Sequence, residues 1–265
     1  NLHVKLLIKI KTLKITIQFF ILFFICGHTY AQESKSFQDR SGILFDVHLG
    51  TGIPASDLKT RFGQTQILGG GISYLPSSIR LTFGLKFSYL FGSDVKEDVL
   101  KPFRTSQLAQ VIGSDGYLAD VQLKMRGYYG QFYTGSIIPL GSQLKARHGI
   151  KWQLGVAYLS HKIRIQDDSR SVTQFNTEFK KGLDRFTSGF SIVPFIGYEY
   201  LGVNGKVNLY AGFEPQIGFT QSRRAYNYDT NATEIGIARK DILLSFKIGW
   251  YLPFYFGKYV DEIEY

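Results

Sequence analysis

The sequence is poor in cysteine, and its single cysteine, Cys26, lies near the N-terminus. A lipoprotein signal would have this thiol acylated, but such signals place a small residue before the cysteine, and Ile25 stands there. If residues 1–31 are removed on export, the rest of the chain has no thiol for a disulfide or a thiolate metal site.

Long apolar runs are also lacking, and the mean hydropathy is only −0.05. The apolar stretch 15–25 is shorter than the ~20 residues of a membrane-spanning helix. Lys5, Lys9, Lys11 and Lys14 precede it, and small or polar residues lead to Ala31. This order predicts a secretory signal peptide, residues 1–31, cleaved after Ala31. A membrane anchor is the alternative.

Residues arranged for catalysis or metal binding are scarce in the sequence. The histidines are not spaced as metal ligands, and Asp167-Asp168 is an isolated acidic pair. Ser160-His161 is the only catalytic candidate, but neighbours on a strand point to opposite faces. We therefore expect no enzyme and no cofactor. The formal charge of +10 is spread along the chain, so we expect no nucleic-acid binding.

What the sequence does have is strict alternation. Residues 241–254 read DILLSFKIGWYLPF, with a large apolar side chain at every even position. Such a pattern predicts a strand with one apolar and one polar face. Similar segments give eight predicted strands. They span 42–52, 66–75, 79–91, 117–138, 149–166, 189–201, 206–221 and 241–256.

The connections between these strands alternate between short and long. This layout is typical of an all-β, eight-stranded antiparallel up-and-down transmembrane β-barrel, with short periplasmic turns and long extracellular loops. The predicted domains are a periplasmic N-terminal segment at 32–41, the barrel at 42–256 and a periplasmic C-terminal tail at 257–265.

Charge decides which face meets lipid. Arg80 and Lys86 share the polar face of one strand, and a cation facing lipid at the midplane costs ~2–4 kcal/mol. The polar faces should therefore point inward, whereas a soluble sandwich or lipocalin-like barrel would reverse them. Large aromatics near the strand ends favour membrane interfaces. They are Tyr89, Phe91, Trp152, Tyr158, Tyr198, Trp250 and Phe254.

An eight-stranded barrel is just wide enough for its own side chains to fill. Inward-facing charges must then be paired, so we expect an ion-pair plug rather than a pore. The predicted interior set is Asp46, Arg80, Lys86, Asp120, Lys124, Arg126, Lys151, Glu199, Glu214 and Lys247.

The segment 247–254 resembles the terminal insertion signal of Gram-negative outer-membrane barrels, carried here by Lys247, Gly249, Leu252 and Phe254. The chain also resembles OmpA-type eight-stranded barrels in layout. Through segments such as 180–187 it resembles barrels associated with type IX secretion. These resemblances imply the outer membrane as location, with its lipid and lipopolysaccharide and the barrel-assembly machinery as partners. Eleven residues follow Phe254, and Pro253 lacks a ladder donor, so we expect strand pairing to fail near it.

The long loops are the expected functional surface. Their aromatic and basic side chains predict a surface for an envelope or secretion-system protein or for lipopolysaccharide phosphates; the alternative is packing of the loops on each other. The set is Phe103, Phe175, Phe179, Lys180, Lys181, Arg185 and Phe186. We expect a non-enzymatic structural or docking barrel. The alternatives are a small-solute channel and a lipid-modifying enzyme.

Overall fold

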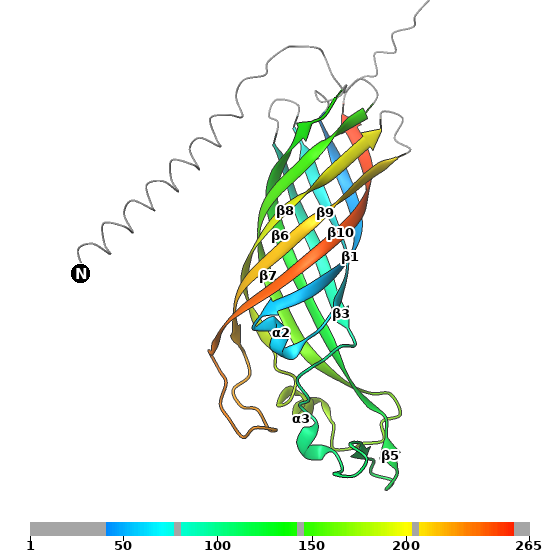
Figure 1. Cartoon of the computed structure of the whole chain (residues 1–265), viewed down its shortest axis with the longest axis vertical. Coiled ribbons are helices and arrows are strands. Elements are labelled where there is room, and N and C mark those ends of the chain that lie inside the picture. Colours follow the sequence, from blue (N-terminus) through cyan, green and yellow to red (C-terminus); the bar gives the residue numbers. More distant parts are fainter. Residues whose placement is uncertain (1–40, 77–80, 142–145, 203–206, 257–265) are drawn as a thin grey trace, which may run out of the picture. The chain divides into compact units, whose positions relative to one another are not determined.

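The computed structural model describes residues 41–76, 81–141, 146–202 and 207–256. The predicted signal peptide, the tail after residue 256 and Arg80 lie outside them. Eight antiparallel strands form a closed barrel in the order β1-β10-β9-β8-β7-β6-β3-β2, so that the last strand meets the first (Figure 1). The predicted fold class is confirmed. The strands are β1 (Ser41–Ser56), β2 (Thr65–Leu75), β3 (Thr82–Gly92), β6 (Val121–Pro139), β7 (Ala146–Asp167), β8 (Thr187–Gly202), β9 (Asn208–Ser222) and β10 (Ala238–Phe256).

The strand connections divide between the two ends of the barrel. The chain between consecutive strands is short after β2, β6 and β8, whereas the longer connections 57–64, 93–120, 168–186 and 223–237 all lie at one end of the barrel. The long loops lie at the lower end in Figure 1. They contain the short helices α2 (Leu58–Arg61), η3 (Lys101–Phe103) and α3 (Thr177–Lys181), and a hairpin of β4 (Val111–Ile112) and β5 (Leu118–Ala119).

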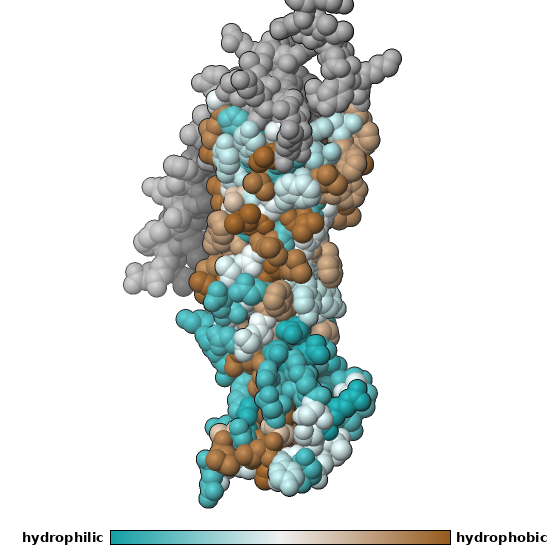
Figure 2. All heavy atoms as spheres, turned by 90° about the vertical axis from the view of Figure 1, so that its right-hand side faces the viewer, coloured by the Kyte–Doolittle hydropathy of each residue, from teal (hydrophilic) through white to brown (hydrophobic). Residues whose placement is uncertain are grey.

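Burial is inverted relative to a water-soluble barrel. On β10, Leu244, Phe246, Ile248 and Trp250 are exposed, whereas Lys247 between them is 1% exposed. Figure 2 shows hydrophobic side chains gathered over the strands and hydrophilic ones toward the long-loop end. An outer face this apolar is stable only in a nonpolar solvent, as in transmembrane barrels. None of the described helices is long and apolar enough to span a membrane.

Pairing continues past Pro253, contrary to the sequence-based prediction. β10 pairs with β1 from Ser56↔Asp241 to Ser41↔Phe256, and Leu44↔Pro253 lies within this ladder. The described pairing of β10 with β9 ends at Trp250↔Leu209. Among the described residues, Pro253 therefore has a paired strand on the β1 side only, an edge position at which a strand tolerates a residue without an N–H donor.

The prediction was also wrong for the faces of β6. Val121, Met125 and Tyr129 are buried, and Lys124 and Arg126 share the outward side with Tyr128 and Phe132. Because tyrosines occupy both faces of this strand, the apolar pattern did not show whether its odd-numbered or its even-numbered residues face outward. Lys124 and Arg126 are therefore not interior charges, and Asp120 lies exposed before the strand begins.

Candidate functional site

Two buried lysine–glutamate pairs lie inside the barrel. Lys151 Nζ of β7 lies 2.5 Å from Glu199 Oε2 of β8, and Lys247 Nζ of β10 lies 2.6 Å from Glu214 Oε1 of β9. Each lysine also donates to a tyrosine hydroxyl, Lys151 to Tyr251 and Lys247 to Tyr129. The hydroxyls supply the additional hydrogen bonds that a buried ion pair needs.

Each ion pair joins neighbouring strands, whereas the tyrosine contacts cross the interior between strands that are not neighbours. Tyr129 belongs to β6, which lies opposite β10 in the ring of eight strands. Its hydroxyl donates to Glu214 Oε1 at 2.9 Å, so that Lys247, Glu214 and Tyr129 join β10, β9 and β6. The hydrogen-bonded groups therefore bridge the barrel across its width.

Lys86 of β3 forms the third cationic centre. Its ammonium group donates to Gln153 Oε1 at 3.1 Å. It lies 4.7 Å from the centre of the Tyr133 ring and 5.1 Å from that of Tyr210. Aromatic faces stabilise a desolvated cation by about 2 kcal/mol. Since Tyr210 belongs to β9, opposite β3, this contact also spans the interior.

Asp46, His48 and Ser88 form a chain of side chains with the geometry of a catalytic triad. His48 Nδ1 lies 2.9 Å from Asp46 Oδ2, and His48 Nε2 lies 2.9 Å from Ser88 Oγ. Ser88 and His48 are 0% and 1% exposed. A nucleophile must approach its substrate, and this serine is enclosed by the barrel wall and its contents.

Glycines of β2 make room for this chain. A Cβ on Gly71 would lie 2.5 Å from Asp46 Oδ1, and one on Gly69 would lie 2.5 Å from His48 Nε2. The glycine run 69–71 therefore forms a thin part of the wall against which two polar side chains pack.

The structure places six of the ten predicted interior charges inside the barrel, three lysines and three acids. They are Asp46, Lys86, Lys151, Glu199, Glu214 and Lys247. The sequence analysis missed the pair of His161 Nε2 and Asp241 Oδ2, at 2.9 Å, and Arg147 beside Glu199. It also missed the interior tyrosines of β6 and β10. An aromatic side chain in a barrel strand can face the lipid or the interior, and the sequence does not distinguish the two.

The long loops close the barrel end with a hydrophobic cluster. Leu58, Phe62, Val99, Leu100 and Leu183 are at most 1% exposed. They come from three different loops and join one cluster with residues of the barrel wall at the long-loop end. Apolar packing on this scale excludes water, and it covers the polar interior.

Two arginines connect all four long loops. Arg185 donates to Glu97 at 2.7 Å and to Asp229 at 2.6 Å. Arg61 lies 3.1 Å from the same Glu97 and 3.5 Å from Glu234. We call these five residues the loop clasp.

The environment of the loop clasp changes the pKa values of its arginines. Burial lowers the pKa of Arg61. Burial acts on Arg185 in the same direction, but its hydrogen bonds to Asp229 and Glu97 outweigh it and raise the pKa of Arg185. Burial thus opposes the charge of Arg61, whereas the two carboxylates stabilise the charge of Arg185.

Most of the predicted loop partner surface is used internally. Phe103, Phe175 and Phe179 pack against one another, with ring centroids 5.6–6.1 Å apart. Arg185 is 2% exposed in the loop clasp, and Phe186 packs under Arg224. Lys181 is bonded to Glu178, and Lys180 is half-buried. The alternative, loops packed on one another, describes this region better, because the aromatic side chains seal the barrel end.

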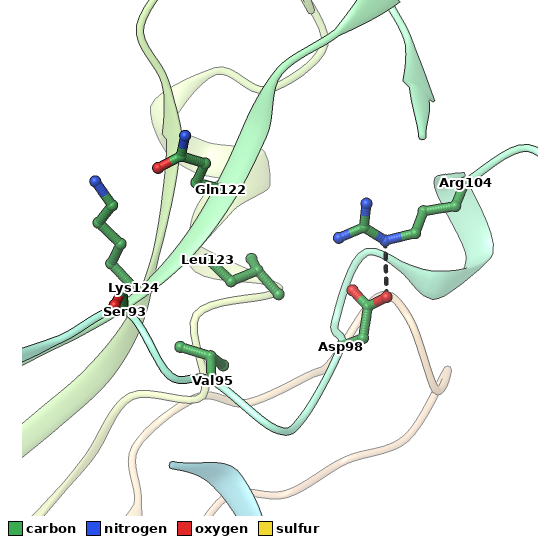
Figure 3. Close-up of a pocket in the computed structure, with 7 residues that line it drawn as sticks. All are labelled: Ser93, Val95, Asp98, Arg104, Gln122, Leu123 and Lys124. Carbon is green, nitrogen blue, oxygen red and sulfur yellow. Dashed lines mark hydrogen bonds and ion pairs between the residues drawn. The ribbon is translucent and has the colours of Figure 1, made fainter. Parts of the chain in front are cut away.

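A cleft of about 430 Å³ lies between the loop 93–120 and β6 (Figure 3). Val95 and Leu123 line it with the ion pair of Arg104 and Asp98, whose closest atoms are 2.7 Å apart. In Figure 3, Leu123 points toward the loop, whereas the amine of Lys124 points away from Arg104. No group of histidine, cysteine or carboxylate ligands suited to a metal ion occurs in the part of the chain that the structure describes.

The closed ring, the apolar outer face and the polar interior together define a small transmembrane β-barrel. No family model matches the chain, and no curated protein sequence matches it. Among solved structures it is similar to Neisserial surface protein A, at 11% identity and a TM-score of 0.40 over 78% of this chain and 96% of that one.

Two further solved structures show the same kind of likeness. The attachment invasion locus protein Ail of Yersinia pestis is 9% identical with a TM-score of 0.35, over 80% of this chain and 98% of that one. The N-terminal β-barrel domain of Pseudomonas aeruginosa OprF is 10% identical with a TM-score of 0.30, over 79% and 96%. The class of this chain follows from its own burial pattern and not from these likenesses.

Proposed function

We propose that this protein is a non-enzymatic outer-membrane barrel with a side-chain-filled interior, acting as a structural or docking component of the cell envelope. The observation that carries the proposal is the set of contacts between opposite strands, of which Lys247–Glu214–Tyr129 is the clearest. Side-chain contacts cross the interior of this barrel, and apolar side chains pack its loop end. Such a barrel is suited to presenting its loops to other molecules and not to conducting solutes.

Three features of the chain support the outer membrane as its location. The signal-like segment 1–31 predicts export, and only helices and closed barrels satisfy their backbone inside lipid. The insertion-signal segment lies on β10 at the seam where the barrel closes against β1. Barrel-assembly machinery is accordingly the first partner in this proposal.

The docking part of the proposal concerns the β4–β5 hairpin. Ile112, Tyr117 and Leu118 are 52%, 77% and 50% exposed, and we call them the hairpin patch. Large apolar side chains at the tip of an ordered loop suit a protein partner. A part in protein secretion is a narrower form of the proposal, supported only by the sequence resemblance.

Cross-linking in intact outer membranes tests this function. We expect the protein in the outer-membrane fraction, cross-linked to an envelope protein, and we expect Ile112→Ser with Tyr117→Ser to lose that product. Substituting the exposed loop residues Gln107→Ser and Gln110→Ser is the control. Recovery of the barrel alone, or a product that both variants retain, would contradict docking through the hairpin patch.

The two alternative functions, a channel and an enzyme, require different structural features. A small-solute channel needs a water-filled route past Lys86, Lys151 and Lys247, and steady conductance would favour it. A lipid-modifying enzyme needs an accessible nucleophile, whereas Ser88 and Ser160 are 0% and 1% exposed. Altered lipid A after deletion of the gene would favour the enzyme.

A further inference from the structure

The outward ends of β6 and β7 carry four cations side by side. Lys124 lies opposite Arg164, and Arg126 lies opposite Lys162, in the antiparallel pairing of the two strands. All four share the outward face, since their neighbours Met125, Ile163 and Ile165 are buried. We call these four residues the basic ladder.

Two like-charged pairs on one face repel each other. Directly opposite residues have Cβ atoms about 5 Å apart, and like charges there are destabilising. No member of the basic ladder forms an ion pair within the described ranges. Among the described residues, the only side-chain hydrogen bond of the basic ladder runs from Arg126 to the carbonyl of Met125, 2.8 Å away. The basic ladder therefore favours an anion from outside the chain.

Acidic neighbours do not neutralise the basic ladder. Asp120 and Asp168 lie beyond its outer edge, where they accept hydrogen bonds from Gln122 and Gln166. Asp167 accepts from the backbone of Ser171 and Val172. In the neighbouring strand β3, the residue opposite Arg126 is the uncharged Phe91. The acids nearest in sequence to the basic ladder thus form their hydrogen bonds with other groups, beyond its outer edge.

The position of the basic ladder indicates the kind of anion. Along the outward face of β6, the next residue toward the barrel's middle is Tyr128, whose ring stacks on Phe87 with the centroids 6.2 Å apart, and Gly130 and Phe132 follow. Tyrosines mark the boundary between lipid chains and headgroups. Two residues of strand span about 7 Å, which places the basic ladder at headgroup depth on the long-loop side.

We propose that the basic ladder binds the phosphate groups of a lipid in the outer leaflet. Arginine donates two parallel hydrogen bonds to a phosphate, and lysine adds a point charge. Four cations in two rows match a headgroup with more than one phosphate. This inference rests on the proposed function, because that function sets the barrel in a bilayer whose outer leaflet faces these residues.

Lipid retention in nanodiscs tests the inference. The full barrel is inserted into phosphatidylcholine nanodiscs and titrated with diphosphorylated lipid A, dephosphorylated lipid A and inorganic phosphate. The ladder variant changes all four cations to glutamine. Its control, Lys59, Lys96, Lys101 and Lys240 to glutamine, removes the same charge from exposed positions elsewhere.

We expect the ladder variant to bind diphosphorylated lipid A at least about tenfold more weakly than the wild type, a loss on the scale of one charge-assisted hydrogen bond. The control should bind as the wild type does, and dephosphorylated lipid A should bind weakly to every form. We also expect the ladder variant to unfold at the same or a higher temperature in nonionic detergent, because it has lost the repulsion. A residue that only supported the fold would do the opposite.

Equal lipid A binding by wild type and ladder variant would overturn the inference, as would equal binding of the dephosphorylated lipid. Binding of inorganic phosphate with the affinity of lipid A would also overturn it, since the site would then serve a free ion. Insertion is scored separately, by the heat-dependent gel shift of a folded barrel. A barrel that inserts but does not retain lipid A refutes only this inference, whereas failure to insert refutes the proposed function.

Discussion

Lys247 lies with its ammonium group between Glu214 and Tyr129, and it is 1% exposed. At the scale of single residues, the interior depends on such pairs being complete. The ammonium group of Lys247 is stable there because a carboxylate and a hydroxyl replace its water. The same holds for Lys151 beside Glu199 and Tyr251.

Removing one partner of a pair should cost more than removing both. We expect Lys247→Met to lower the free energy of unfolding by about 3–5 kcal/mol, because Glu214 would remain charged and unpaired. The double variant Lys247→Met with Glu214→Gln should recover most of that loss. Urea unfolding in detergent measures it, with the exposed Lys101→Met as control. A double variant as unstable as the single one would contradict the pairing.

Gly71 should be sensitive to a single added methyl group. Gly71→Ala would put a carbon 2.5 Å from Asp46 Oδ1, whereas a Cβ on Gly130 has no neighbour within 4 Å. We expect Gly71→Ala to destabilise the barrel by about 1–3 kcal/mol and Gly130→Ala to change stability little. Thermal unfolding of the two variants compares them, and equal melting temperatures would argue against tight packing of Asp46 on β2.

At the scale of elements, alternation predicted all eight strands, because a strand with one lipid face and one polar face keeps a period of two. On β10 the prediction placed Lys247 correctly inside. On β6 it failed, since Tyr128 and Tyr129 offer an aromatic residue to each face. The loop clasp could not be predicted, because its arginines and acids come together only when four distant loops meet.

The loop clasp should hold the long loops in place. Arg185→Gln removes the charge that joins Glu97 and Asp229, so we expect the loops to be cut several-fold faster by trypsin while the strands stay protected. Arg170→Gln is the control, since Arg170 is exposed in the same loop. Cleavage is followed by mass spectrometry of intact fragments. Unchanged loop cleavage in Arg185→Gln would show that the apolar cluster alone orders the loops.

The closing strand should also depend on its terminal aromatic residue. Phe254 contacts Phe45 of β1 edge-to-face at 5.6 Å, across the seam of the barrel. We expect Phe254→Ala to slow assembly of the folded form, followed by its heat-dependent gel shift after synthesis. Phe256→Ala, on the same outward face, is the control. An equal delay in both variants would indicate a general need for apolar surface and not an insertion signal.

At the scale of the whole molecule, the interior and the loops act together. Three lysines and three acids are buried in the interior, Lys247 and Lys86 contact tyrosines of the opposite strands, and the hydrophobic cluster closes the long-loop end. In this account the outer face of the barrel contacts lipid, and the tips of the long loops are available to other molecules. The sequence alone predicted this division, since inward charges in so narrow a barrel must pair, although it did not identify the interior tyrosines of β6 and β10.

Single-channel recording in planar bilayers tests the central claim, a barrel filled by its own side chains. The folded wild type should show no steady conductance, and the variant Lys151→Ala with Lys247→Ala and Tyr129→Ala should show brief openings because its cross-barrel contacts are lost. Control recordings use Lys59→Ala with Lys101→Ala, exposed lysines outside the interior, which should stay silent. Steady ohmic conductance from the folded wild type would contradict the account.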